Sequence, residues 1–268
     1  MGDQVGANLE LLISPKEKTT TRVVFSLSLR PCPTLGVGQG ALYRSIITVM
    51  RELPLLSDSY YHIYNRGSLK QVLFHDKADY SRFLFLIVYL QSPLVLSQIN
   101  RYIRNYLDKG MFEVKEKDIT SICEDRFVEV VNFCIMPNHF HLTIKAVTEA
   151  GISKYMHRVG NAYAKYFNKK YDKSGHVFQG AFKAKFIASD RQLAYLSAYI
   201  HRNPHELYEW KDKANYYPWS SYQDYKINRW GNLLASAEIV NSFSSYDEYQ
   251  NYVESSGAKE QWGEDDDL

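Results

Sequence analysis

The sequence lacks the features that would place it in a membrane, outside the cell or among disulfide-rich proteins. Its longest apolar run, Phe83 to Leu90, is far shorter than the roughly 20 residues that cross a bilayer. The first residues carry neither the basic segment nor the apolar segment of a secretory signal. The three cysteines are an odd number without metal-binding spacing. We therefore expect a cytoplasmic protein with reduced thiols and no membrane partner.

An excess of charge of one sign is also missing, because 32 basic residues stand against 30 acidic residues. A hydrophobic content of 45% can bury a substantial core, which excludes disorder as the main state. The charges are nevertheless unevenly spread. Ten basic and two acidic residues lie between Ser153 and Arg202, whereas Asp247 to Leu268 holds eight acidic residues and Lys259. The second segment is typical of a solvated, disordered tail.

Changes in pattern along the chain predict three parts. Residues 1–49 show no sustained periodicity, and we expect them to be a poorly ordered extension. Residues 50–230 are expected to form the working domain. Residues 231–268 are then a C-terminal extension that ends in the acidic tail.

The working domain mixes strand and helix patterns. Runs rich in β-forming residues predict strands over 60–65, 127–136 and 139–144. Helical spacing of apolar residues predicts helices over 79–90, 152–171 and 190–202. Residues 91–126 fit neither pattern, and a tight turn is expected at Pro137. Strands that are joined partly by tight turns favour an α+β fold over a doubly wound parallel sheet.

The helix predicted over 152–171 has an apolar face and a basic face. A basic face interleaved with tyrosines is typical of surfaces that neutralise phosphates and stack on unpaired bases, although an ordinary solvated face has the same composition. The candidate phosphate contacts on this helix and just after it are Lys154, Arg158, Lys165, Lys169, Lys183 and Lys185.

Two short patterns contain side chains that could do chemistry. His139 and His141 are two residues apart on a predicted strand, so they share a face and could bind one divalent ion. An isolated pair of this kind is more often a pair of half-buried histidines at a strand edge than a metal site. Tyr199 and Asn203 are one helical turn apart, at the edge of an apolar stripe. Neither pattern alone distinguishes a site from packing.

Five motifs that occur in a fixed order between about residues 60 and 225 favour a functional site over simple packing. They are YNRG at 64–67, MPNHFHL at 136–142, SGHVFQG at 174–180, YIHRNP at 199–204 and WSSY at 219–222. In this order they resemble the REP-associated tyrosine transposases, which are single-tyrosine transposases of the HUH nuclease superfamily. The resemblance implies a ferredoxin-like α+β domain with a central antiparallel sheet and packed helices.

The same resemblance implies a transposase that cleaves and rejoins DNA through a 5′-phosphotyrosine. Tyr199 would be the nucleophile, and His139, His141 and Asn203 would hold Mg²⁺ or Mn²⁺. The expected partner is single-stranded DNA with a hairpin, such as a palindromic repeat. The protein would act as a monomer or homodimer associated with the bacterial nucleoid. The group that takes the proton of Tyr199 is open between His201 and water.

Two other functions stay open. The run His141 to Ile144 fits one element of the two-histidine phosphoesterases, but the sequence shows no second copy. A domesticated protein that binds hairpin DNA without cleaving it is the other alternative, and the intact predicted site argues against it. One departure from the family is Ala181, where members commonly have arginine, so one expected phosphate contact is missing.

Overall fold

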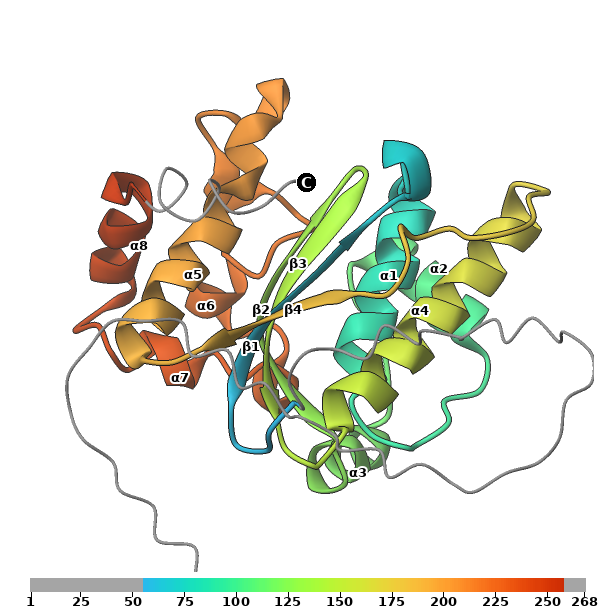
Figure 1. Cartoon of the computed structure of the whole chain (residues 1–268), viewed down its shortest axis with the longest axis horizontal. Coiled ribbons are helices and arrows are strands. Elements are labelled where there is room, and N and C mark those ends of the chain that lie inside the picture. The colour runs from blue at the N-terminus through green and yellow to red at the C-terminus, as the bar shows by residue number, and fades with distance from the viewer. Residues whose placement is uncertain (1–54, 258–268) are drawn as a thin grey trace, which may run out of the picture. The chain divides into compact units, whose positions relative to one another are not determined.

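The structure is a computed structural model, and it describes residues 55–257 (Figure 1). The predicted N-terminal extension, residues 1–49, and the last part of the acidic tail lie outside the described residues. Within the described range the chain forms one four-stranded sheet and eight α-helices. No helix in this range combines the length and the apolar character that a bilayer span needs.

The elements have the following bounds. The strands are β1 (Tyr60–Arg66), β2 (Val128–Met136), β3 (His139–Ala146) and β4 (Lys183–Ile187). The longer helices are α1 (Lys77–Tyr89), α2 (Ile99–Lys109), α3 (Glu116–Glu124), α4 (Gly151–Lys170), α5 (Asp190–Arg202) and α8 (Tyr246–Ser255). The short helices are α6 (Asp224–Ile227) and α7 (Ala237–Val240). Single 3-10 turns are η1 (Ser68–Lys70), η2 (Asn203–Glu206), η3 (Tyr208–Trp210), η4 (Ala214–Tyr216) and η5 (Gly231–Leu233).

The strand order across the sheet is β2-β3-β1-β4, and all neighbouring strands are antiparallel. Along the chain these strands and two crossover helices follow each other as β1, α1, β2, β3, α4 and β4. This connection and this order define the ferredoxin-like fold, so the predicted fold class is confirmed. Helices α2 and α3 are inserted between α1 and β2, and they account for the residues that fitted no simple pattern.

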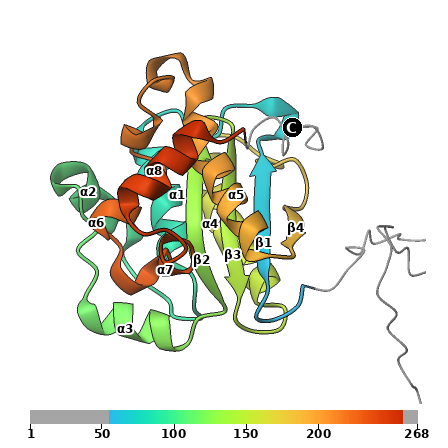
Figure 2. The ribbon, with the colours of Figure 1, turned by 90° about the vertical axis from the view of Figure 1, so that its left-hand side faces the viewer.

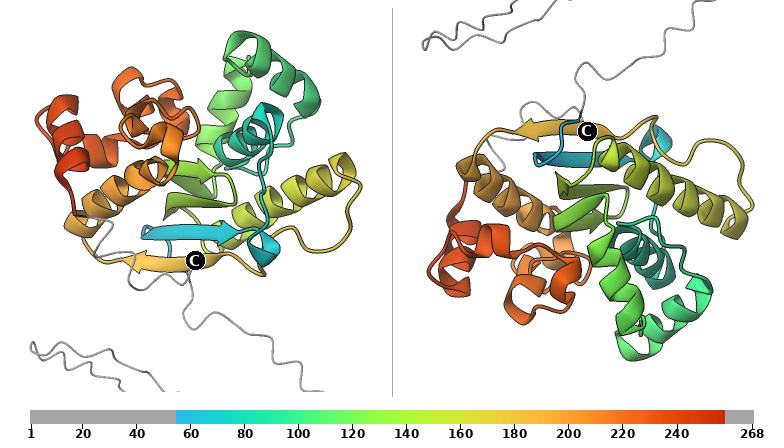
Figure 3. Two further views of the ribbon diagram at one scale, coloured as in Figure 1. Left: turned by 90° about the horizontal axis from the view of Figure 1, so that it is seen from above. Right: turned by 90° about the horizontal axis from the view of Figure 1, so that it is seen from below.

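The sheet has different layers on its two faces (Figures 1 and 3). Helices α1 and α4 cover one face, where Phe140 of β3 packs on Phe83 of α1 with ring centroids 4.9 Å apart. Phe83 in turn meets Tyr163 of α4 at 5.1 Å. Helix α5 packs on β2 and β3 from the other side of the sheet. Figure 2 views the molecule from this side, with α8 in front. Because side chains alternate along a strand, the neighbours of Phe140 point toward α5.

Helix α5 has the predicted bounds. Ser189 is its N-cap, and the hydroxyl of Ser189 accepts a hydrogen bond from the backbone N–H of Gln192 at 3.3 Å. The helix ends at Arg202, but Asn203 keeps helical angles of φ −51° and ψ −40° and starts η2. Helical geometry at Asn203 holds its side chain on the side of the helix that carries Tyr199, one turn earlier.

The C-terminal segment corrects the expectation of a disordered tail from Asp247 onward. Residues 246–255 form helix α8, in which Tyr249 and Val253 are fully buried. Arg202 of α5 donates to the backbone oxygen of Val253 at 2.9 Å. Burial of these two side chains, one turn apart, therefore stabilises the helical conformation of this segment, while the acidic residues occupy the solvent side of the helix.

Candidate active site

His139 and His141 lie on β3, on the face of the sheet that α5 covers. Strand β3 is paired on both sides, and His141 stands opposite Cys134 of β2 and Tyr64 of β1. The two imidazole rings are 5.0 Å apart between centroids, with planes at 86°. His141 is fully buried, whereas His139 at the turn is half-buried. The predicted pair thus shares one face, at the end of the strand nearest the turn.

The Nδ1 atom of each ring is held by a neighbouring side chain. Nδ1 of His139 lies 2.7 Å from Oδ1 of Asn138, and Nδ1 of His141 lies 2.9 Å from Nε2 of His62. An amide oxygen only accepts hydrogen bonds, so the proton of the His139 ring is on Nδ1 and the lone pair is on Nε2. An imidazole whose other nitrogen donates to a neighbour is the usual form of a metal-bound histidine.

Tyr199 of α5 lies against this histidine pair. Its ring centroid is 5.5 Å from that of His141, with planes at 87°, and 6.0 Å from that of His62, with planes at 77°. Only 4% of Tyr199 is exposed. The structure therefore joins the predicted nucleophile and one predicted metal ligand in a direct edge-to-face contact, although they are far apart in the sequence.

Asn203 is buried next to the end of the same helix, with 1% of its surface exposed. Its amide nitrogen donates to the backbone oxygen of Tyr199 at 2.9 Å. This bond orients the amide so that Oδ1 is the atom that could bind a cation. It also connects the predicted third ligand directly to the backbone of the predicted nucleophile.

The donor set fits a divalent ion of the first transition row. Among residues 55–257 no three His, Cys, Asp or Glu side chains are grouped so that they could hold a metal. An ion at this site would therefore rest on two imidazole nitrogens and one amide oxygen, with further positions left to water and phosphate. Imidazole is an unusual ligand of Mg²⁺, so these residues suit Mn²⁺ or another first-row ion better.

Lys183 and Lys185 stand beside the histidine pair. They lie on the edge strand β4, opposite Tyr64 and His62 of β1. Residues opposite each other on antiparallel strands point to the same face, so both lysines share the face of His141. The ammonium of Lys183 lies 5.5 Å from the ring centroid of Tyr64. This edge of the sheet therefore places two positive charges next to the site.

The predicted basic residues of α4 lie on the opposite face of the sheet from Tyr199. Lys154, Lys165 and Lys169 are exposed. The guanidinium of Arg158 instead donates to the backbone oxygens of Ser92 and Leu94, the latter at 2.9 Å. Arg158 anchors the segment that follows α1, while its DNA contact stays a prediction.

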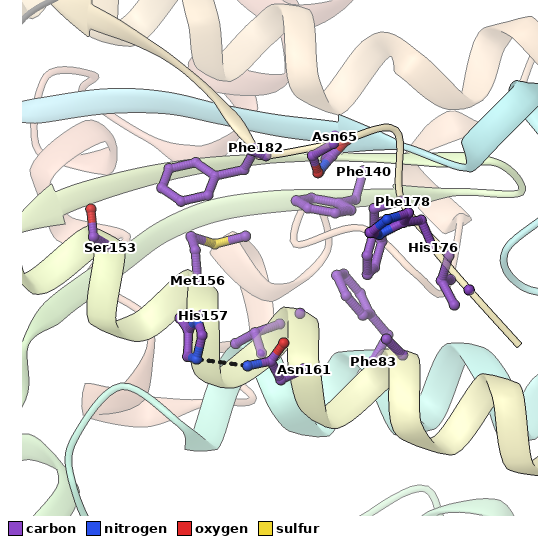
Figure 4. Close-up of a pocket in the computed structure, with 17 residues that line it drawn as sticks. Asn65, Phe83, Phe140, Ser153, Met156, His157, Asn161, His176, Phe178 and Phe182 are labelled. Atoms are coloured by element: carbon purple, nitrogen blue, oxygen red, sulfur yellow. Dashed lines mark hydrogen bonds between the residues drawn. The ribbon is translucent and has the colours of Figure 1, made fainter. Parts of the chain in front are cut away.

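A cavity of about 490 Å³ opens beside α4 (Figure 4). Its polar rim includes His157 and Asn161, which are joined by a hydrogen bond of 2.7 Å, and its apolar part includes Phe140, Phe178 and Phe182. None of its lining residues is acidic. Neither the predicted lysines nor Tyr199 line the cavity, so it is a concave surface beside α4 whose lining is free of carboxylates.

His201 is separated from the site although it follows Tyr199 by two positions. Its ring is fully buried on the other side of α5, with Nε2 2.8 Å from Oγ of Ser221 and Nδ1 2.6 Å from the hydroxyl of Tyr249. Burial lowers the pKa of His201 to about 3. Nδ1 is thus engaged in the contact between α5 and α8, and Nε2 in the contact of α5 with the segment before α6, so His201 serves packing.

The sequence patterns did not predict one member of the site, His62. It is fully buried on β1 and stacks on Tyr64 at 4.7 Å. The alternation of β1 does place His62 and Tyr64 on one face. Only the register of β1 against β3 brings His62 to His141, and that register is not readable from a single strand.

Comparison with known proteins found one matching family and a similar solved structure. Residues 89–203 match the family described as IS200-like transposases, and this segment contains the histidine pair, Tyr199 and Asn203. The match confirms the resemblance that the ordered motifs predicted. A solved structure of a REP-associated tyrosine transposase bound to a REP hairpin is 13% identical, with a TM-score of 0.44 over 66% of this chain and 84% of the other. No curated protein matches the sequence.

Proposed function

We propose that the chain is a metal-dependent DNA transposase that cleaves and rejoins single-stranded DNA through Tyr199. The observation that carries this proposal is the edge-to-face contact of Tyr199 with His141, at 5.5 Å between ring centroids. The match of residues 89–203 to IS200-like transposases supports it, because the matched segment holds the four side chains that the chemistry needs. His139, His141 and Asn203 are the proposed metal ligands.

The reaction would proceed by in-line displacement at phosphorus. The hydroxyl oxygen of Tyr199 forms a bond to the scissile phosphate, and the bond from phosphorus to the 3′ oxygen breaks. The 3′ oxygen takes up a proton, and the 5′-phosphate stays on Tyr199. A bound divalent ion would supply charge neutralisation at a non-bridging oxygen. Attack of a 3′-hydroxyl on the phosphotyrosine reverses these steps and rejoins the strand without ATP.

The tyrosine must lose its proton during the attack, because its ordinary pKa of about 10 leaves it protonated at neutral pH. His201 cannot take this proton directly, since its ring is buried on the other side of α5 and hydrogen-bonded at both nitrogens. We therefore assign the proton to water. Lys183 and Lys185 would bind the phosphates that flank the reacting one.

The substrate is proposed to be single-stranded DNA that carries a hairpin. A flexible strand can bend into a site between a helix and a sheet, whereas a stiff duplex cannot. The hairpin is proposed because of the family resemblance. The same resemblance is compatible with either a monomer or a homodimer. A cytoplasmic location at the nucleoid stays a prediction.

Formation of a covalent adduct tests the proposal. Hairpin-bearing single-stranded DNA and Mn²⁺ should give a protein–DNA adduct that survives denaturing electrophoresis. EDTA should prevent the adduct, and Tyr199→Phe should abolish it while DNA binding survives. Tyr208→Phe is the matched control, because Tyr208 is 96% exposed and outside the site.

Two results would contradict the transposase proposal. DNA binding by the wild type without any adduct would favour a domesticated binding protein. Cleavage without an adduct, equally active in Tyr199→Phe, would favour phosphoesterase chemistry instead.

A further inference from the structure

His62 makes a direct polar contact with one of the predicted metal ligands, His141. Its Nε2 lies 2.9 Å from Nδ1 of His141, and the two ring centroids are 5.1 Å apart with planes at 19°, so the rings meet end to end through these nitrogens. Both residues are completely buried. A contact of this length between two ring nitrogens is a hydrogen bond, in which one ring donates and the other accepts.

The direction of this bond determines which nitrogen of His141 can bind a cation. A neutral imidazole carries one proton, so a lone pair on Nε2 requires the proton on Nδ1. When Nδ1 of His141 donates to His62, Nε2 of His141 has the lone pair. His62 then accepts at Nε2 and carries its own proton on Nδ1. One buried acceptor thus selects the metal-binding tautomer of its neighbour.

The other predicted ligand is held in the same way. Nδ1 of His139 lies 2.7 Å from the side-chain oxygen of Asn138, which leaves the lone pair on Nε2. Two histidines on one strand therefore present the same nitrogen, although their partners come from different places. Asn138 belongs to the turn between β2 and β3, and His62 belongs to β1.

The surroundings of His62 keep its ring in place. It stacks on Tyr64 at 4.7 Å, and the ring of Tyr199 stands over it at 6.0 Å with planes at 77°. Strand β1 is paired with β3 and β4, so the backbone of His62 is in the interior of the sheet. A ring that is fixed on all these sides can hold the orientation of His141.

We propose that His62 is a positioning residue that fixes the tautomer and the orientation of His141, and that Asn138 does the same for His139. This inference rests on the proposed function, because it concerns the metal site of that reaction. It extends the site from a histidine pair to three histidines, of which two bind the ion and one orients.

The first test measures Mn²⁺ affinity of the full-length protein without DNA, by titration calorimetry. His62→Leu and His62→Gln are a matched pair of similar volume, and only the glutamine retains an acceptor. Loss of such an orienting partner weakens metal binding by roughly 10- to 100-fold. His62→Leu should show this loss, and His62→Gln should stay within about threefold of the wild type, below that range. His75→Ala, an exposed histidine away from the site, should change nothing.

A second variant tests metal binding at a position where a general loss of folding is not expected. Asn138→Ala changes a half-buried turn residue and removes the acceptor of His139 without opening the core. It should weaken Mn²⁺ binding by a similar factor while circular dichroism and the unfolding midpoint stay close to those of the wild type. Equal Mn²⁺ affinity of Asn138→Ala and the wild type would overturn its assigned role.

The tautomers themselves can be observed in the metal-free protein. Long-range ¹H–¹⁵N spectra of labelled protein should show the proton of His141 and of His139 on Nδ1. In His62→Leu the signal of His141 should change to the other tautomer or to a mixture, and that of His139 should not change. A proton on Nε2 of His141 in the wild type would overturn the inference.

The outcomes separate this inference from the proposed function. If the wild type binds Mn²⁺ and forms the adduct, while His62→Leu and His62→Gln bind Mn²⁺ equally well, only the role of His62 is wrong. If the wild type neither binds Mn²⁺ nor forms the adduct, the inference and the proposed function are both wrong.

Discussion

At the scale of single residues, Tyr199 and His201 lie two positions apart on one helix but contact different parts of the molecule. A step of two positions turns a side chain by about 200° around a helix, so the two residues face opposite sides of α5. Tyr199 faces the sheet and its histidines, whereas His201 faces α8 and bonds to Ser221 and Tyr249. Tyr199 therefore contacts the proposed metal site, whereas His201 contributes to packing on the other side of the helix.

The buried neutral state of His201 predicts a pH dependence of stability. Burial lowers its pKa from 6.5 to about 3, so below pH 6.5 the unfolded chain takes up a proton that the native chain does not. The stabilisation is complete above about pH 6.5 and is lost as the pH falls toward the native pKa. Between pH 7.5 and 5 this residue should lower the free energy of unfolding by about 2 kcal/mol.

Urea unfolding at these two pH values measures the effect. His201→Gln keeps a hydrogen-bonding side chain but cannot become charged, so its free energy of unfolding should fall by about 2 kcal/mol less than that of the wild type. The same pH dependence in both proteins would mean that His201 does not account for it.

At the scale of elements, α4 is fixed to α1 by a buried carboxylate. Asp79 accepts hydrogen bonds from the hydroxyls of Tyr166 at 2.8 Å and Tyr171 at 2.6 Å, and pairs with Lys170 at 2.5 Å. Burial alone would raise the pKa of Asp79, but these bonds and the backbone N–H of His75 outweigh it and lower the pKa. The helix is thereby held so that its exposed lysines project as a fixed row.

This row predicts a salt-dependent contribution to DNA binding. Each lysine that neutralises a phosphate releases condensed counterions, with a slope of about 0.7 in log affinity against log salt for a single strand. The double variant Lys165→Gln, Lys169→Gln should therefore bind hairpin DNA more weakly and lower the slope by roughly 1.4.

Fluorescence anisotropy at several salt concentrations gives both quantities. Lys117→Gln is the matched control, because Lys117 is exposed on α3, outside the predicted basic surface. An unchanged slope in the double variant would remove α4 from the DNA interface.

At the scale of the whole molecule, the fold brings together residues that the sequence keeps apart. Strand β3 lies inside the sheet between β2 and β1, and α5 crosses the face on which the histidines stand. The match to IS200-like transposases begins after β1 and includes β2, β3 and α5, up to Asn203. The ferredoxin-like arrangement thus places the proposed metal ligands on an interior strand and the proposed nucleophile on a separate helix.

The elements that the sequence predicts well are those with a long pattern and a buried face. Strands β2 and β3 and helix α4 follow their predicted bounds to within two residues. Strand β4 was not predicted, because the edge strand Lys183–Ile187 is short and lysine-rich and has only one buried residue. Helix α8 was missed because it has only two buried anchors, Tyr249 and Val253, among acidic residues.

The candidate site was predictable in its residue types but not in its contacts. The motifs point to Tyr199 and the histidine pair through a family resemblance, and local spacing could not have joined them. His62 required the pairing of β1 with β3, which depends on hydrogen bonds between distant segments. The structural role of Arg158 could not be predicted from the sequence. Its guanidinium bonds to the segment after α1, and the path of that segment is known only from the structure.

The polarity of the covalent link tests the central claim most directly. Hairpin-bearing single-stranded DNA is labelled at its 5′ end in one sample and at its 3′ end in another, and each is incubated with the protein and Mn²⁺. The account predicts that only the 3′-labelled piece stays on the protein, that peptide mass spectrometry finds it on Tyr199, and that the 5′-labelled piece ends in a free 3′-hydroxyl. Attachment of the 5′-labelled piece, or attachment to a residue other than Tyr199, would contradict the account.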